Sequence, residues 1–165
     1  MKKSIARFWQ QFLNNHTSSR PGAEATLPKN IEDALMIKPK EVYKARDYLL
    51  VYESQADIEA LQIDLDLFNQ INISPGGVIV TAPGDTHDFV SRYFTPQASI
   101  LEDPVTGSAH CTLVPYWAKR LQKSSFHAYQ CSQRGGELWC EDNGDRVLVS
   151  GYAFTYFAGW VAPGV

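Results

Sequence analysis

Residues 107–121 constrain the fold more than any other stretch of this sequence. If this segment is a helix, apolar side chains cover most of its circumference: Ala109, Leu113, Val114, Tyr116, Trp117 and Leu121. A helix that is apolar on nearly every side belongs in a core, because a surface helix keeps a polar face. Pro115 lies inside the segment and cannot donate to the carbonyl of Cys111, so we expect a kink there.

Strand-like runs surround this helix in the sequence. Aromatic and aliphatic runs or alternation predict strands at 48–52, 78–81, 88–94, 128–132, 137–141, 146–149 and 152–157. Asp142-Asn143-Gly144-Asp145 is a strong hairpin-turn signal. Short helices are expected at 30–35 and 64–71, and Ser54 is expected to cap a helical segment. The sequence therefore predicts an α+β fold, in which a curled mixed sheet wraps round a central buried helix at about 107–122.

The first 30 residues lack the strand-like patterns of the later sequence. Ile5, Phe8, Trp9 and Phe12 form one apolar face, which predicts a short amphipathic helix over 1–15. Ser, Thr, Pro and Gly are frequent in 16–28, which predicts a linker. We therefore divide the chain into an N-terminal helix and linker, 1–30, and a domain at 31–160.

Composition excludes several classes of protein. The chain has 165 residues, 44% of them hydrophobic, and a net charge of −3 with no basic stripe, so we expect one domain and no nucleic-acid partner. Three cysteines without a Cys-x-x-Cys pair indicate free thiols and make a zinc site improbable. No long apolar run follows Met1, so we expect no signal peptide, no membrane span and a cytoplasmic protein.

The segment 102–111 is where chemistry is most plausible. Thr106-Gly107-Ser108 opens the buried helix, and a helix N-terminus offers unpaired N–H groups to a carboxylate. Asp103 can hydrogen-bond a ligand or shift a proton, and His110 can act as an acid or base. A purely structural interpretation stays open, in which Thr106 or Ser108 caps the helix, Asp103 closes a turn and His110 lies in the core.

Several segments resemble the C-terminal half of the phenazine-biosynthesis-like (PhzF-like) isomerase family. They are 91–94, 102–111, 115–118, 132–138, 144–147 and, earlier, 46–51. They occur in the family's order from about Ile31 to Phe157. The resemblance implies one half of a diaminopimelate epimerase-like fold, in which two similar halves enclose the active site. It also implies isomerisation of a small carboxylate-bearing metabolite by proton transfer, without a cofactor or metal.

The resemblance also implies roles for individual residues. Asp103 would position the substrate and its transferable proton, and His110 is the second catalytic candidate. The backbone at Gly107, Ser108 and Ala109 would hold a substrate carboxylate or carbonyl. Arg92, Ser132 and Gly135 complete the expected substrate-binding set. Epimerases of this fold use paired cysteines, but Cys111 lies a turn below the helix mouth, so we expect a small buried hydrophobe.

One departure from the family pattern leaves two hypotheses open. The family's general base is a glutamate near a Gly-Asn-Pro motif, and no such motif occurs in these 165 residues. Glu102 and Glu137 are only loose candidates for the missing base. His87 and Asp88 form another titratable pair, which we interpret as a turn before a strand. The chain is then either an isomerase half that needs a partner surface, or a non-catalytic small-acid binder or inactive remnant. In either case we expect a homodimer, because a half-protein exposes apolar surface.

Overall fold

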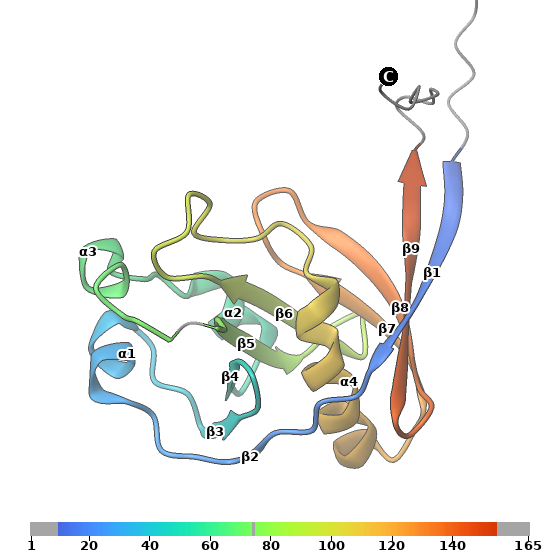
Figure 1. The fold of residues 1–165 in the computed structure, drawn as a ribbon, viewed down its shortest axis with the longest axis horizontal. Helices are drawn as coiled ribbons and strands as arrows, with labels where there is room; N and C mark the ends of the chain where they lie inside the picture. The colour runs from blue at the N-terminus through green and yellow to red at the C-terminus, as the bar shows by residue number, and fades with distance from the viewer. Residues whose placement is uncertain (1–9, 74, 155–165) are drawn as a thin grey trace, which may run out of the picture.

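The computed structural model describes residues 10–73 and 75–154, which form one nine-stranded mixed sheet and four helices (Figure 1). The sheet order is β1-β9-β8-β7-β6-β5-β4-β3-β2, and only the β4–β5 and β6–β7 pairs are parallel. The strands are β1 (Gln10–Ser18), β2 (Ala23–Glu24), β3 (Glu41–Lys44), β4 (Tyr48–Val51), β5 (Val78–Pro83), β6 (Phe89–Phe94), β7 (Ser125–Gln130), β8 (Gly136–Asp142) and β9 (Arg146–Phe154). The helices are α1 (Lys29–Ala34), α2 (Gln55–Ala60), α3 (Leu65–Phe68) and α4 (Gly107–Leu121).

Helix α4 is the predicted core helix, with the predicted bounds. Its buried side chains share one hydrophobic cluster with residues of β4 to β9. At the centre, the Trp117 ring stacks on Phe89 with 5.6 Å between centroids, and Trp117 Nε1 donates to Thr81 Oγ1 at 3.1 Å. An α+β fold built on one main helix is therefore confirmed.

The other face of the sheet is covered mainly at one end. Leu49 and Val51 of β4 belong to the α4 cluster, whereas Leu50 between them belongs to a second cluster with α1, α2 and α3. This alternation follows from the period of two in a strand. Strands β4 to β6 are thus buried on both faces, while β7 and β8 turn the polar or aromatic side chains of His127, Glu137 and Trp139 away from α4.

Pro115 has a clear structural consequence. Because proline has no N–H, the Cys111 carbonyl loses its helical partner. The backbone N–H of Arg20 donates to that carbonyl at 2.8 Å, and Thr17 Oγ1 lies 3.3 Å from Cys111 Sγ. The Cys111 carbonyl, which Pro115 leaves without a helical partner, therefore binds the segment that follows β1 to helix α4.

The predicted helix at 1–15 is wrong over residues 10–15, which lie in β1; residues 1–9 lie outside the described chain. Strand β1 pairs antiparallel with β9 from Gln10↔Phe154 to Ser18↔Arg146. Hydrogen bonding along nine residues of β9 outweighs the helical spacing of a few apolar residues. The predicted linker also contains the end of β1 and all of β2.

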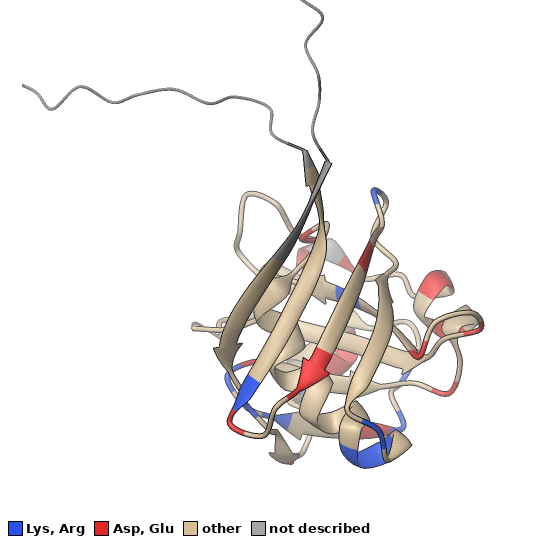
Figure 2. Ribbon diagram, turned by 90° about the vertical axis from the view of Figure 1, so that its right-hand side faces the viewer, with Lys and Arg blue, Asp and Glu red and all other residues tan. Residues whose placement is uncertain are grey.

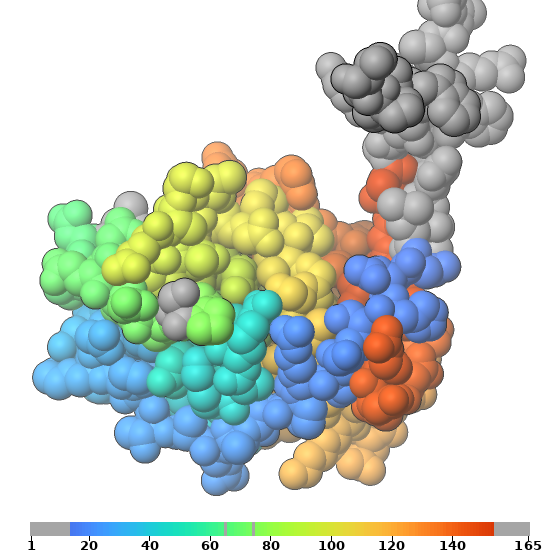
Figure 3. All heavy atoms as spheres, in the orientation of Figure 1, coloured from blue at the N-terminus to red at the C-terminus, as the bar shows by residue number. Residues whose placement is uncertain are grey.

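Strand β9 continues through Gly151, where two strands were expected. The β8–β9 hairpin turns at the predicted Asn143-Gly144, and Gly144 has the positive φ, 78°, that favours glycine there. Figure 1 shows β1 and β9 side by side, projecting beyond the other strands, and the coloured blue and red atoms of the two chain ends adjoin in Figure 3.

Charged residues of both signs are interspersed over the ribbon (Figure 2). Two of the cations at the C-terminal end of α4 are paired: Arg120 contacts Glu41 at 2.7 Å and Lys123 contacts Asp88 at 2.7 Å. Among the described residues, no helix is long and apolar enough to cross a membrane.

Candidate functional site

An open groove of about 980 Å³ lies beside the N-terminal end of α4. Three predicted ligand-binding residues, Gly107, Ser108 and Gly135, line it. Gly107 is exposed, and a Cβ at this position would meet no atom within 4 Å. The other lining residues come from β1, β8, β9 and the loops before α4 and β8: Asn15, Thr17, Val105, Arg134, Gly136, Glu137, Leu138, Val149, Ser150, Gly151, Tyr152 and Ala153.

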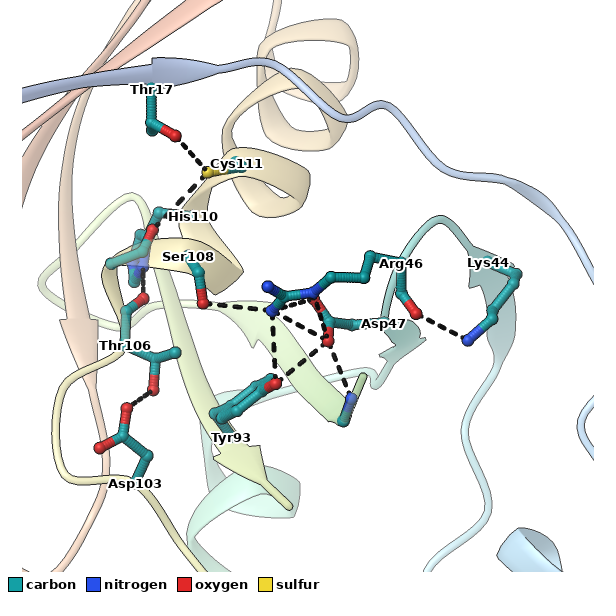
Figure 4. Close-up of polar contacts among 12 residues, drawn as sticks. Thr17, Lys44, Arg46, Asp47, Tyr93, Asp103, Thr106, Ser108, His110 and Cys111 are labelled. Atoms are coloured by element: carbon teal, nitrogen blue, oxygen red, sulfur yellow. Dashed lines mark hydrogen bonds and ion pairs between the residues drawn. The ribbon is translucent and has the colours of Figure 1, made fainter. Parts of the chain in front are cut away.

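No side chain in the described part of the chain caps the N-terminus of α4. Thr106 is the N-cap residue, but its hydroxyl donates to Asp103 Oδ2 at 2.6 Å and makes no capping hydrogen bond (Figure 4). The alternative in which Thr106 or Ser108 serves as a side-chain cap is therefore wrong. An uncapped helix end keeps N–H groups and partial positive charge available for an anion.

Gln130 fixes the loop that leads into α4. Its side chain is fully buried; Oε1 accepts from the Thr106 backbone N–H at 2.8 Å, and Nε2 donates to the Asp103 carbonyl at 2.6 Å and to Thr106 Oγ1 at 3.2 Å. Sequence reasoning missed this residue. A glutamine at an inward position of a strand, beside Ala128, is the signal that could have indicated a buried polar contact.

Arg46, Asp47, Tyr93 and Ser108 form a polar cluster at the start of α4 (Figure 4). The Asp47 carboxylate is 1% exposed and accepts from Arg46, from the Tyr93 hydroxyl at 3.0 Å and from the Gly77 N–H at 2.8 Å. Arg46 Nη2 in turn donates to Ser108 Oγ at 3.2 Å. Burial and the Asp47 charge raise the pKa of Tyr93, so its hydroxyl stays protonated and donates. The cluster places a guanidinium at the helix mouth.

His110 lies in the core rather than in the groove. It is fully buried, and its Nδ1 must carry the proton because it contacts the Thr106 carbonyl at 2.8 Å. Nε2 is buried and has no hydrogen-bond partner within residues 10–73 and 75–154, and the ring centroid lies 6.0 Å from that of Phe89. Burial lowers the pKa of His110 to about 4. A neutral core histidine on this side of α4 does not fit the predicted catalytic role.

Arg92 is also held away from the groove. Its guanidinium pairs with both carboxylate oxygens of Glu102, at 2.8 and 3.0 Å, and donates to the carbonyls of Ile58 and Leu61. These contacts join β6 to α2 and to the loop before α4. They leave both Arg92, expected to bind substrate, and Glu102, a loose candidate base, in a structural ion pair.

Ser132 and Gly135 shape the loop on the opposite wall. Ser132 Oγ donates to the Pro104 carbonyl at 2.7 Å and accepts from the Gly135 N–H at 3.1 Å. Gly135 has φ of 68°, and a Cβ there would lie 2.0 Å from Tyr129 OH. Ser132 thus holds the loop, and Gly135 faces the groove.

Cys111, Cys131 and Cys140 are free thiols, as predicted. Cys111 and Cys140 are buried, and Cys131 is half-buried. Burial raises the pKa of Cys131 to about 11 and that of Cys140 to about 12, so these thiols stay protonated near neutral pH.

Comparison with known proteins identifies the family. A family model described as phenazine biosynthesis-like protein (PhzC-PhzF) matches residues 11–159. An uncharacterized isomerase of Pseudomonas aeruginosa is 48% identical over 130 residues, 78% of this chain and 49% of the relative. A second from the same organism is 42% identical over 157 residues, 94% of this chain and 59% of the relative.

Solved structures agree in fold. A PhzF-family protein of Enterococcus faecalis superposes with a TM-score of 0.79 at 36% identity, covering 88% of this chain and 58% of that protein. A putative PhzC/PhzF protein of Clostridium difficile gives a TM-score of 0.79 at 31% identity, covering 92% and 58%. The chain spans about half the length of the curated relatives it matches. It belongs to the phenazine-biosynthesis-like (PhzC/PhzF) protein family.

Proposed function

We propose that this chain contributes the acid-binding half of a cofactor-independent isomerase site. The observation that carries the proposal is the uncapped N-terminus of α4, which opens on the groove at exposed Gly107. A small carboxylate-bearing metabolite would accept hydrogen bonds from the amides of Gly107, Ser108 and Ala109. The name isomerase, given to the Pseudomonas aeruginosa relatives, supports the reaction type.

Two cations and the carboxylate of Asp103, which precedes the groove-lining residues Val105, Gly107 and Ser108 in the chain and does not itself line the groove, complete the proposed site. Arg134 lines the groove, and the guanidinium of Arg46 reaches Ser108 from the other side. Both favour an acidic ligand. Asp103 lies next to the helix mouth and is oriented by the Thr106 hydroxyl at 2.6 Å. We assign Asp103 the positioning of the transferable proton, because a proton-transfer residue needs a fixed approach to the substrate.

The general base comes from a surface outside the described groove. Glu137 is the one carboxylate among the described lining residues, and its oxygens lie 3.9 and 3.5 Å from His87 Nε2 and His127 Nε2. We infer that a second protein surface closes the groove in the manner of the two-half diaminopimelate epimerase-like fold, with the sheet curled round α4. A second copy of the chain, related by a two-fold axis, is our candidate for that surface. Size-exclusion chromatography with light scattering at micromolar concentration tests it, and a clean monomer contradicts the dimer.

A non-catalytic small-acid-binding module is the alternative function. The same contacts favour it: Asp103 Oδ2 already accepts from Thr106, and Glu137 faces two histidines. A receptor needs only the amides and cations of the groove. A catalyst also needs a base within hydrogen-bond reach of a carbon-bound proton.

Solvent-deuterium exchange into a panel of small carboxylic acids distinguishes the two. The proposal predicts exchange into at least one acid by the wild-type protein, loss in Asp103→Ala, and retention in Asp33→Ala, which removes an exposed carboxylate on α1. A thermal-shift screen of the same panel measures binding separately. Stabilisation without exchange favours the binding module, and the absence of both overturns both functions.

A further inference from the structure

Two histidines and a glutamate come together on the outward face of the sheet, away from α4. The metal-binding atoms of His87, His127 and Glu137 all lie within 4.8 Å of one another. Glu137 Oε1 is 3.9 Å from His87 Nε2, and Glu137 Oε2 is 3.5 Å from His127 Nε2. These residues are far apart in sequence and come from β7, β8 and the β5–β6 turn.

Strand register places two of the three ligands. In the β7–β8 pair, His127 is opposite Trp139 and Tyr129 is opposite Glu137. His127 and Glu137 are therefore diagonal neighbours on one face, close enough for long side chains to meet. The His127 ring stacks on Trp139 with 4.7 Å between centroids, which limits its rotation.

The β5–β6 turn supplies the third ligand and is fixed to the same strand. Asp88 N–H donates to the His127 carbonyl, and Asp88 Oδ2 accepts from the His127 N–H, both at 2.8 Å. Gly84 lets the turn close, because a Cβ there would lie 2.5 Å from the His87 carbonyl oxygen. The His87 ring stacks on Tyr129, with 5.3 Å between centroids. The backbone therefore holds the two histidines against each other.

The ring nitrogens are disposed as metal ligands. His87 Nδ1 lies 3.1 Å from Thr86 Oγ1, a contact that leaves Nε2 free when Nδ1 carries the proton. Metal-bound histidines commonly donate the other ring N–H in this way. His127 Nε2 is buried without a hydrogen-bond partner among the described residues, and Glu137 Oε2 lies 3.5 Å away.

We propose that His87, His127 and Glu137 form a binding site for one divalent transition-metal ion of the zinc class. Two imidazoles and a carboxylate suit such ions, whereas Mg²⁺ and Ca²⁺ prefer oxygen ligands alone. Ligand atoms about 2.0–2.1 Å from zinc lie roughly 3.3 Å apart in tetrahedral geometry, so small rotations suffice. The Glu137 side chain is 51% exposed and can make that rotation.

This site differs from the zinc site that cysteine spacing made improbable, since it uses no thiol. With three protein ligands, the ion keeps a coordination position for water or for an outside group. It would also join the β5–β6 turn to the β7–β8 hairpin. An ordinary contact between the glutamate and protonated histidines is the competing interpretation, and it predicts no metal affinity.

Zinc titration of the full chain by calorimetry tests the proposal. We expect one Zn²⁺ per chain, with binding at least about tenfold weaker in His87→Gln, His127→Gln and Glu137→Gln. His16→Gln removes an exposed histidine of β1 and is the matched control; Cys131→Ser excludes the half-buried thiol. Both controls should bind as the wild type does.

Histidine ring NMR of the wild-type protein keeps the test valid even if a variant fails to fold. Added Zn²⁺ should shift the ring signals of His87 and His127 and leave those of His16 and buried His110 unchanged. Absence of zinc binding, or wild-type affinity in the three ligand variants, overturns the site.

Discussion

Strands β7 and β8 take part in two polar sites of opposite construction. Toward α4, Leu138 and the loop at Gly135 face a groove in which the groups proposed to bind an anion are mainly backbone amides of the helix N-terminus. Away from α4, His127 and Glu137 face His87, and every proposed ligand atom belongs to a side chain. Successive residues of one strand serve opposite faces, so the two sites share a scaffold, and Glu137 takes part in both: it lines the groove, and its carboxylate faces the histidines.

The difference shows which kinds of site a single sequence reveals. The proposed ligand-binding groups of the groove lie largely in one continuous segment, 103–109, which the Arg46–Asp47 cluster supports through Ser108. The histidine site depends on the register of β7 and β8 and on the β5–β6 turn, so no short sequence motif predicts it. Changes that damage one site and spare the other test this separation.

The largest expected effect is that of Asp47→Ala on the groove side. The substitution leaves the Gly77 N–H, the Tyr93 hydroxyl and Arg46 without their buried acceptor. We expect the free energy of unfolding to fall by about 4 kcal/mol, since a buried group loses its charged partner. Denaturant unfolding measures this loss.

The control for Asp47→Ala is Glu24→Ala, which removes an exposed carboxylate of β2 and should change stability by less than about 0.5 kcal/mol. Zinc binding at the outward site should survive Asp47→Ala wherever the protein remains folded. A stability loss under about 1 kcal/mol would show that Asp47 does not hold the cluster together.

Acidification should act through His110, which is buried in α4 with its ring near that of Phe89. Its folded-state pKa, about 4, lies below the value of about 6.5 for an unfolded chain. The unfolded state therefore binds more protons between these values, and stability falls as pH drops from about 6.5 to about 4, by about 3 kcal/mol in all. Unfolding curves across this pH range measure the slope.

His110→Gln separates this contribution from those of other groups, because glutamine can donate to the Thr106 carbonyl without gaining a proton. The variant should lose most of the acid dependence, whereas His16→Gln should keep it. An unchanged slope in His110→Gln would contradict the assignment of a neutral buried histidine.

Gly107→Ala should give the smallest stability change and the clearest functional one. The added Cβ meets open space, so the helix gains about 0.5–1 kcal/mol from the lower backbone entropy of alanine when unfolded. The same methyl group stands where an acid approaches the amides. We therefore expect the melting temperature of the free protein to rise slightly. The acid found in the thermal-shift screen should stabilise the variant less than the wild type. Unchanged acid binding would show that the ligand binds elsewhere.

Much of the fold could be predicted because its signals are local. The apolar circumference of 107–121 specified α4, Asn143-Gly144 specified the hairpin, and Ser54 specified the start of α2, where it forms a capping box with Asp57. The position of the helix mouth next to Asp103 was also predictable, because the residues involved are neighbours in sequence, whereas the sequence left open whether Thr106 or Ser108 caps it.

The remaining features depend on distant pairing. Strand β1 lies across from residues 146–154, and nothing within 10–18 encodes that partner. Gln130 reaches Thr106 across 24 positions, and Arg92 is engaged by Glu102 and by carbonyls of α2 and the residue after it. The burial of His110 depends on which side of an almost wholly apolar helix faces Phe89, which periodicity alone does not settle.

Titration of backbone amides by NMR tests the central claim most directly. The probe is the small carboxylic acid that raises the melting temperature most, added to ¹⁵N-labelled protein. The account predicts saturable shifts concentrated at Gly107, Ser108, Ala109 and Gly135, which need higher acid concentrations in Gly107→Ala, with no change at His127. Shifts that bypass the start of α4, or no shifts for any acid of the panel, would contradict an anion receptor at this helix end.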